Sequence, residues 1–168
     1  QRATPPRFLV YLDNDGLNNQ LIALRHACWL GTITHRSVVV ADWMSNHNEV
    51  EVLPYGRVGT CDVVDCAHLE RHCGASVTWL SAFEMPDPED VVECAHAACY
   101  EQNTSDRVLY LPNKQAFFLG LRRISYGFTT KVFSLTDAIR MSPSLAKRAS
   151  NIAGLAVGGY NAVHLRVY

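Results

Sequence analysis

Two short apolar runs on either side of a helical pattern constrain the fold more than any other feature. The first run, residues 8–12, is β-prone and ends in the turn residues 13–16. Apolar residues then recur at helical spacing, with Asn18 as the expected cap and Gly31 as the expected end. The second run, residues 37–41, completes strand, loop, helix and strand within about 35 residues, the length of a βαβ unit. A parallel, buried sheet is therefore predicted.

The same alternation continues through the middle of the chain. Helical spacing predicts a helix over residues 65–73, and a strand-like run follows over residues 75–80. An Asp-Pro start with an alanine-rich continuation predicts a helix over residues 88–100. Residues 108–111 form another predicted strand, whereas residues 117–133 are apolar but broken by glycines and receive no assignment. Alternating strands and helices indicate an α/β fold.

The last third contains one clear helix start. The Ser-Pro pair at 142–143 opens a helix that is expected to run to Ala156, because proline at the first helical position loses no needed hydrogen bond. Residues 160–167 are the last predicted strand. We therefore predict a Rossmann-like parallel sheet with helices on both faces over residues 8–168, preceded by a linker, residues 1–7.

Composition excludes several classes of function. Charged residues make up 18% of the chain and the formal net charge is -1, so nucleic acid is not an expected partner. No apolar run approaches the roughly 20 residues that cross a bilayer. An Asn-Thr-Ser sequon at Asn103 and an even number of cysteines favour an oxidising, secretory compartment. The six cysteines are Cys28, Cys61, Cys66, Cys73, Cys94 and Cys99.

The loop after the first strand is the first candidate site. Gly16 allows a sharp turn, and the two amides of Asn18 and Asn19 stand at a helix start, where free backbone N–H groups favour anionic or polyhydroxyl ligands. Ligands of open α/β sheets bind at such strand ends. The alternative is that Asn18 only caps the helix while Asn19 and Gln20 are solvated. The segment lacks the further glycines of the dinucleotide fingerprint.

The last predicted strand carries the second candidate site. His164 and Arg166 are two positions apart and therefore point to the same face of a strand. The planar arginine fork suits a diphosphate oxygen, and the histidine beside it can donate or accept near neutral pH. An exposed face of an edge strand is the alternative interpretation.

Four segments, in this order and spacing, together resemble the GDP-fucose protein O-fucosyltransferase superfamily. Residues 15–20 are similar to its Gly-Leu/Phe-Asn-Asn/Gln-Gln start, and residues 62–69 are similar to its φ-Asp-Val-Asp-His-Leu segment with one insertion. Residues 141–146 and 162–166 resemble its helix and its His-Leu-Arg strand. The resemblance covers the whole chain.

This resemblance implies the amino-terminal lobe of a two-lobed GT-B glycosyltransferase that transfers fucose from GDP-fucose to a hydroxyl of a protein or glycan. Arg166 would stabilise the diphosphate leaving group, and Asn19 would orient the fucose or phosphate. The remaining donor and acceptor contacts would come from Gly16, Leu17, Asn18, Gln20 and His164. No metal and no cofactor besides the GDP-fucose substrate is expected, because arginine takes the role of a cation. The resemblance implies a location in the lumen of the endoplasmic reticulum or Golgi. A membrane anchor on the full-length protein is compatible with that location.

Two departures from the family pattern affect the expected activity. The position after Gln20 is often arginine in the family and is Leu21 here, and the sequence ends at Tyr168, before the acidic residue that normally follows. We expect a missing second lobe and little or no transfer by this chain alone. A non-catalytic carbohydrate- or protein-binding lobe is the alternative function. A small NAD-binding protein is a third, against which the missing glycine fingerprint counts.

A zinc site is the rival to a disulfide framework in the middle of the chain. Its candidate ligands are Cys61, Cys66, His68, His72 and Cys73. Their spacing is not a usual zinc pattern, and the Glu between the two histidines is not adjacent to the first one. Surface histidines with disulfide-bonded or buried cysteines are therefore favoured over a metal.

Overall fold

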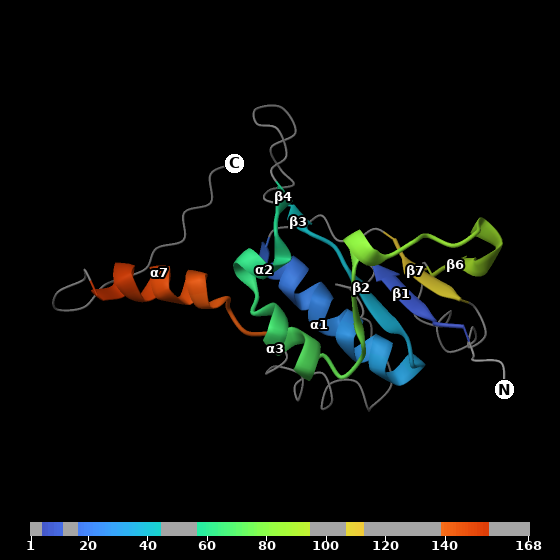
Figure 1. Ribbon diagram of the computed structural model, residues 1–168, viewed down its shortest axis with the longest axis horizontal. Coiled ribbons are helices and arrows are strands. Elements are labelled where there is room, and N and C mark those ends of the chain that lie inside the picture. Colours follow the sequence, from blue (N-terminus) through green and yellow to red (C-terminus); the bar gives the residue numbers. More distant parts are fainter. Residues whose placement is uncertain (1–4, 12–16, 45–56, 95–106, 113–138, 155–168) are drawn as a thin grey trace.

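The computed structural model describes five stretches of the chain, which are drawn in colour in Figure 1. They are residues 5–11, 17–44, 57–94, 107–112 and 139–154. The predicted strand at 160–167 and the unassigned segment at 117–133 lie outside the described residues.

Five parallel strands form the central sheet, in the spatial order β5-β2-β1-β7-β6. β1 is in the middle and pairs in parallel with β2 on one side and β7 on the other. β5 and β6 are the two outer strands. The strands are β1 Phe8–Tyr11, β2 Ser37–Val40, β5 Val77–Trp79, β6 Val91–Glu93 and β7 Val108–Leu111. The predicted Rossmann-like parallel sheet is confirmed. The prediction of helices on both faces also involves segments that lie outside the described residues.

The helix between β1 and β2 is longer than predicted. α1 spans Leu17–Thr34, so Asn18 lies in its first turn and Gly31 lies inside it, and Gly31 as the helix end is wrong. The glycine is required by packing, because a Cβ there would lie 2.6 Å from Val38 Cγ2 on β2. The helix instead ends before His35, whose φ of 53° is left-handed.

Two short helices connect the β2 side of the sheet to β5. α2 spans Thr60–Val63 and α3 spans Cys66–His72, which confirms the helix predicted over residues 65–73. Asp65 caps α3 because its Oδ1 accepts a hydrogen bond of 3.0 Å from the backbone N–H of His68. A disulfide between the buried Cys28 and Cys73 joins α1 to the end of α3.

The helix predicted to start at residue 88 is wrong in the described residues. η2, Pro88–Asp90, is a single 3-10 turn, and the chain then enters strand β6. Val91 and Val92 are β-branched and lie in register with β7, opposite Val108 and Leu109. Pairing with a neighbouring strand therefore outweighs the local helix-start pattern. The rest of that prediction, residues 95–100, lies outside the described residues.

The remaining elements lie outside the central sheet. β3 (Trp43–Met44) and β4 (Arg57–Val58) form an antiparallel pair, and η1 (Leu80–Ala82) follows β5. α7 spans Pro143–Gly154 and starts as predicted, since Ser142 Oγ accepts a hydrogen bond of 3.2 Å from the backbone N–H of Leu145. Within the described ranges no helix is long and apolar enough to cross a membrane.

The core lies between α1 and the sheet. α1 contributes its buried face, β1, β2 and β7 contribute their apolar residues, and α3 contributes Leu69. Buried leucines and valines make up most of it: Leu9, Leu24, Leu30, Leu69, Leu109, Leu111, Val38, Val40 and Val64. A strand that is apolar on consecutive residues is typical of a parallel sheet covered by other layers.

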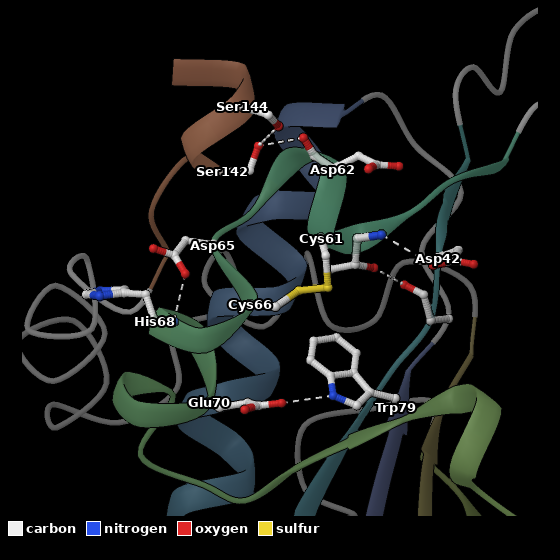
Figure 2. Close-up of a disulfide and its surroundings, with 12 residues drawn as sticks. Asp42, Cys61, Asp62, Asp65, Cys66, His68, Glu70, Trp79, Ser142 and Ser144 are labelled. Atoms are coloured by element: carbon white, nitrogen blue, oxygen red, sulfur yellow. Dashed lines mark hydrogen bonds between the residues drawn. A yellow bond between two sulfur atoms is a disulfide. The ribbon is translucent and has the colours of Figure 1, made fainter. Parts of the chain in front are cut away.

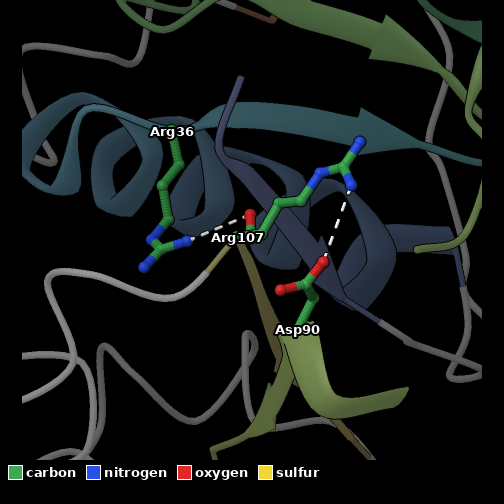
Figure 3. A network of polar contacts seen from close by, with 3 residues as sticks. All are labelled: Arg36, Asp90 and Arg107. Atoms are coloured by element: carbon green, nitrogen blue, oxygen red, sulfur yellow. Dashed lines mark hydrogen bonds and ion pairs between the residues drawn. The ribbon is translucent and has the colours of Figure 1, made fainter. Parts of the chain in front are cut away.

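A buried arginine closes the amino-terminal edge of the sheet (Figure 3). Arg36 directly precedes β2 and is 2% exposed. Its Nη1 donates hydrogen bonds to the carbonyl oxygen of Phe8, at 3.3 Å, and to that of Arg107, at 3.4 Å. One side chain thus links the starts of β2, β1 and β7. The side chain of Arg107 is separate from this network and forms an exposed ion pair with Asp90 at 3.6 Å.

Candidate functional site

The first turn of α1 lies at the carboxyl-terminal edge of the sheet. β1 ends at Tyr11 and α1 begins at Leu17, so the helix starts just beyond the end of the central strand. Its first turn contains no acidic residue, which leaves the helix dipole available to an anionic or polar ligand. Ligands of parallel α/β sheets bind at this edge.

The structure describes four of the residues predicted to bind substrate, all in this first turn. Leu17 and Asn18 are exposed and Asn19 is half-buried, so these three side chains are accessible from outside. Gln20 is 3% exposed and belongs to the interior. Gly16, His164 and Arg166 lie outside the described residues, as does the predicted approach of Arg166 to this loop. The site roles of these seven residues stay predictions.

A cavity of about 470 Å³ lies at the same edge, beyond the ends of β2 and β5. Its described lining comes from the end of β2, the start of α2 and the turn between β5 and η1. The lining residues are Val40, Asp42, Cys61, Trp79, Leu80 and Ser81. A volume of this size is typical of small-molecule sites, which are apolar pockets with a few polar groups.

Three hydrogen bonds orient the polar and aromatic groups of the cavity (Figure 2). Asp42 Oδ1 accepts a hydrogen bond of 3.3 Å from the backbone N–H of Thr60, the first residue of α2. Thr60 Oγ1 in turn donates to the carbonyl oxygen of Ala41 at 2.8 Å. At the end of β5, Trp79 Nε1 donates to Glu70 Oε1 on α3 at 2.9 Å. This contact orients the indole ring.

A second disulfide forms the wall next to α2. Cys61 on α2 is bonded to Cys66 at the start of α3, and Cys61 is exposed toward the cavity. The closed loop is short, with a sequence separation of 5. The bond therefore fixes the angle between two small helices that have little core of their own.

Two of the four segments that carry the family resemblance lie side by side behind this wall. Ser142 Oγ donates to the carbonyl oxygen of Asp62 at 2.6 Å, and Ser142 N donates to that of Val63 at 2.8 Å. Asp65 N donates to the carbonyl oxygen of Arg140 at 2.8 Å. The start of α7 is therefore anchored on α2 and α3, as Figure 2 shows for Ser142 and Asp62.

The disulfides remove the cysteine ligands from the zinc alternative. Cys61, Cys66 and Cys73 are all disulfide-bonded, and a disulfide sulfur is not the thiolate that zinc binds. His68 and His72 stack on each other with ring centroids 4.1 Å apart. No cluster of three metal-binding side chains occurs among the residues that the structure describes.

Asp42 and Trp79 were not among the residues predicted from sequence. A positional pattern points to both, since Asp42 closely follows the predicted strand 37–41 and Trp79 lies at the end of the predicted strand 75–80. In a parallel sheet, residues at the carboxyl ends of adjacent strands meet at one edge. Applying that rule to every predicted strand, and not only to the first, would have found them.

Comparisons with known proteins support the fold and reveal no sequence relative. No protein family and no curated protein matches the sequence. A crystal structure of POFUT1 in complex with GDP matches in three dimensions, with a TM-score of 0.59 and 10% identity. The match covers 91% of this chain and 57% of that one. The chain therefore has an α/β fold similar to that of POFUT1. It thus spans little more than half the length of the glycosyltransferase that it resembles.

Proposed function

We propose that this chain is the amino-terminal lobe of a fucosyltransferase-like glycosyltransferase, which transfers fucose from GDP-fucose to a hydroxyl of a protein or glycan. The observation that carries the proposal is the position of Asn18 and Asn19. They occupy the first turn of α1 at the carboxyl edge of a parallel sheet whose fold is similar to that of POFUT1, which was crystallised with GDP. Residues 17–20, the described part of the segment that resembles the family start, are thus next to the edge where such sheets bind ligands.

The proposed chemistry is an inverting displacement at the anomeric carbon of fucose. The acceptor oxygen forms a bond to that carbon and loses its proton, while the bond from the carbon to the diphosphate breaks and GDP leaves with the electron pair. Arg166 stabilises the negative charge that develops on the diphosphate, and Asn19 orients the fucose or phosphate. Neither a metal nor a further cofactor takes part. A second lobe supplies most of the GDP site.

The secretory lumen is the proposed location. Cys28, Cys61, Cys66, Cys73 and Cys94 are all disulfide-bonded, and disulfides persist in oxidising compartments.

Transfer from GDP-fucose by the full-length protein tests the proposed function. Arg166→Lys should lower turnover by about 10²- to 10³-fold, because lysine keeps the charge but cannot give two parallel N–H bonds to a diphosphate. Asn19→Ala should lower it by roughly 3- to 10-fold, since it removes one neutral hydrogen bond. The 168-residue chain alone should bind GDP weakly and transfer no fucose.

Matched controls come from the exposed face of α7. Arg148→Lys and Asn151→Ala make the same chemical changes at exposed positions that are not among the proposed site residues, and they should leave turnover unchanged. Wild-type turnover in Arg166→Lys would remove Arg166 from the mechanism. A full-length protein that binds glycans but transfers nothing from GDP-fucose would favour the non-catalytic lobe instead.

A further inference from the structure

The cavity beyond β2 and β5 has a chemistry that differs from that of a nucleotide site. Asp42 is the only charged residue among its described lining residues, and it is exposed. None of the described lining residues is an arginine or a lysine. The lining residue that α2 contributes is Cys61, which is disulfide-bonded. A carboxylate repels a diphosphate at close range. The GDP part of a donor is therefore a poor occupant of this cavity.

The same groups suit a neutral polyhydroxyl ligand. Asp42 Oδ1 accepts from Thr60 N, and within the described residues the second carboxylate oxygen has no protein partner. A carboxylate accepts hydrogen bonds from hydroxyl groups strongly, because the acceptor is charged. Ser81 adds a hydroxyl that can donate or accept. Val40, Leu80 and the Trp79 ring supply the apolar surface against which the C–H face of a sugar ring packs.

We propose that this cavity binds one pyranose ring of a glycan, with Asp42 accepting from its hydroxyls and Trp79 packing on its apolar face. That the sugar belongs to the acceptor rests on the proposed function. The cavity lies at the same sheet edge as the first turn of α1, so the acceptor sugar and the proposed donor groups share one edge. The substrate class is then a glycan in preference to an unglycosylated protein.

Both contact groups are held in place before the ligand arrives. The Trp79 ring is fixed by its bond to Glu70, and Asp42 is fixed by its bond to Thr60. The Cys61–Cys66 disulfide keeps α2 and α3, which carry Thr60 and Glu70, at a constant angle. Fixed groups lose little side-chain entropy on binding, which matters for a ligand with few contacts.

Binding of simple glycosides, measured without any donor, tests the site. The probes are the methyl glycosides of galactose, glucose, mannose and N-acetylglucosamine, titrated into the full chain and followed by saturation-transfer NMR and by tryptophan fluorescence. At least one should bind with a Kd on the order of millimolar. Asp42→Asn should weaken it about tenfold or more, because a charged acceptor becomes a neutral one. Trp79→Ala should abolish detectable binding, and Trp79→Phe should keep most of it.

The control is Asp87→Asn, the same chemical change at an exposed residue that makes no capping hydrogen bond to η2 and does not line the cavity. It should bind like wild type, and thermal unfolding should show that all variants fold. Binding by none of the probes, binding that Asp42→Asn and Trp79→Ala leave unchanged, or displacement of the glycoside from the cavity by GDP would each overturn the proposal. Because no donor is present, glycoside binding that depends on Asp42 and Trp79 supports the site even if the transfer assay fails.

Discussion

The two edges of the sheet are built in different ways. At the amino-terminal edge, Arg36 is buried and donates to the backbone carbonyl oxygens of Phe8 and Arg107, so charge is used to close the structure. At the carboxyl-terminal edge, Asp42 is exposed beside a cavity, and the backbone of Thr60 holds it in place. Ligands of a parallel sheet bind at the second edge, which leaves the first free for contacts that hold the strands together.

The two disulfides follow the same division. The Cys28–Cys73 bond is buried, has a sequence separation of 45, and precedes the point where the chain enters β5. The Cys61–Cys66 bond has a separation of 5 and lies in the cavity wall. A bond that closes a long loop restricts the unfolded chain more than one that closes a short loop. We infer that the first bond stabilises the fold and that the second positions the site.

Removing each disulfide should separate these roles and gives the largest expected effect. In the loop-entropy description, loss of Cys28–Cys73 lowers the free energy of unfolding by about 4 kcal/mol, and loss of Cys61–Cys66 lowers it by about 2 kcal/mol. Urea unfolding of the double alanine variants measures both. The Cys61→Ala/Cys66→Ala variant should weaken glycoside binding while it remains folded. Equal losses of stability in the two variants, with glycoside binding intact in Cys61→Ala/Cys66→Ala, would show that the two disulfides do not have different roles.

The sequence predicts the strands of the buried sheet better than it predicts the candidate site. β1, β2 and β7 were found because a strand buried on both faces is an uninterrupted apolar run. Gly31 was misjudged because a helix-ending glycine and a close-packing one look alike until Val38 is known to face it. The segment after Pro88 was misjudged because the local pattern favours a helix, whereas pairing with β7 decides for a strand.

The candidate site depends on which strands are neighbours. The first turn of α1 was predicted because residues 15–20 are contiguous. Asp42 and Trp79 are far apart in the sequence and come together only because β5 pairs with β2, in the register Val40 opposite Trp79. Local patterns carry no information on that strand order, and this is the physical reason why the cavity was missed.

Replacing the buried arginine should give the second largest effect, at the closed edge alone. Arg36→Met leaves the carbonyl oxygens of Phe8 and Arg107 without its two hydrogen bonds and should lower the free energy of unfolding by about 2 kcal/mol. Arg148→Met on the exposed side of α7 is the control and should change stability little. Chemical unfolding gives the stability, and the glycoside titration should be unaltered. A loss of binding as large as the loss of stability would show that the two edges are coupled.

The smallest expected effect comes from the ion pair beside that arginine. Asp90 and Arg107 are 3.6 Å apart, and their side chains are 44% and 43% exposed, so water and salt screen their attraction. Asp90→Asn and Arg107→Gln should each lower the free energy of unfolding by no more than about 0.5 kcal/mol, and a double-mutant cycle should give a coupling of the same order that fades with added salt.

Arg107 makes this a stringent test, because its carbonyl oxygen accepts from Arg36 and from Phe8 N, and Arg107→Gln removes only the exposed side-chain contact. If Arg107→Gln lowered the free energy of unfolding as much as Arg36→Met does, the Arg107 side chain, and not its backbone carbonyl, would be what stabilises this edge. The expected outcome is the reverse. The charge that stabilises this edge is that of Arg36, which is 2% exposed and donates to two backbone carbonyl oxygens, whereas the ion pair is screened by water.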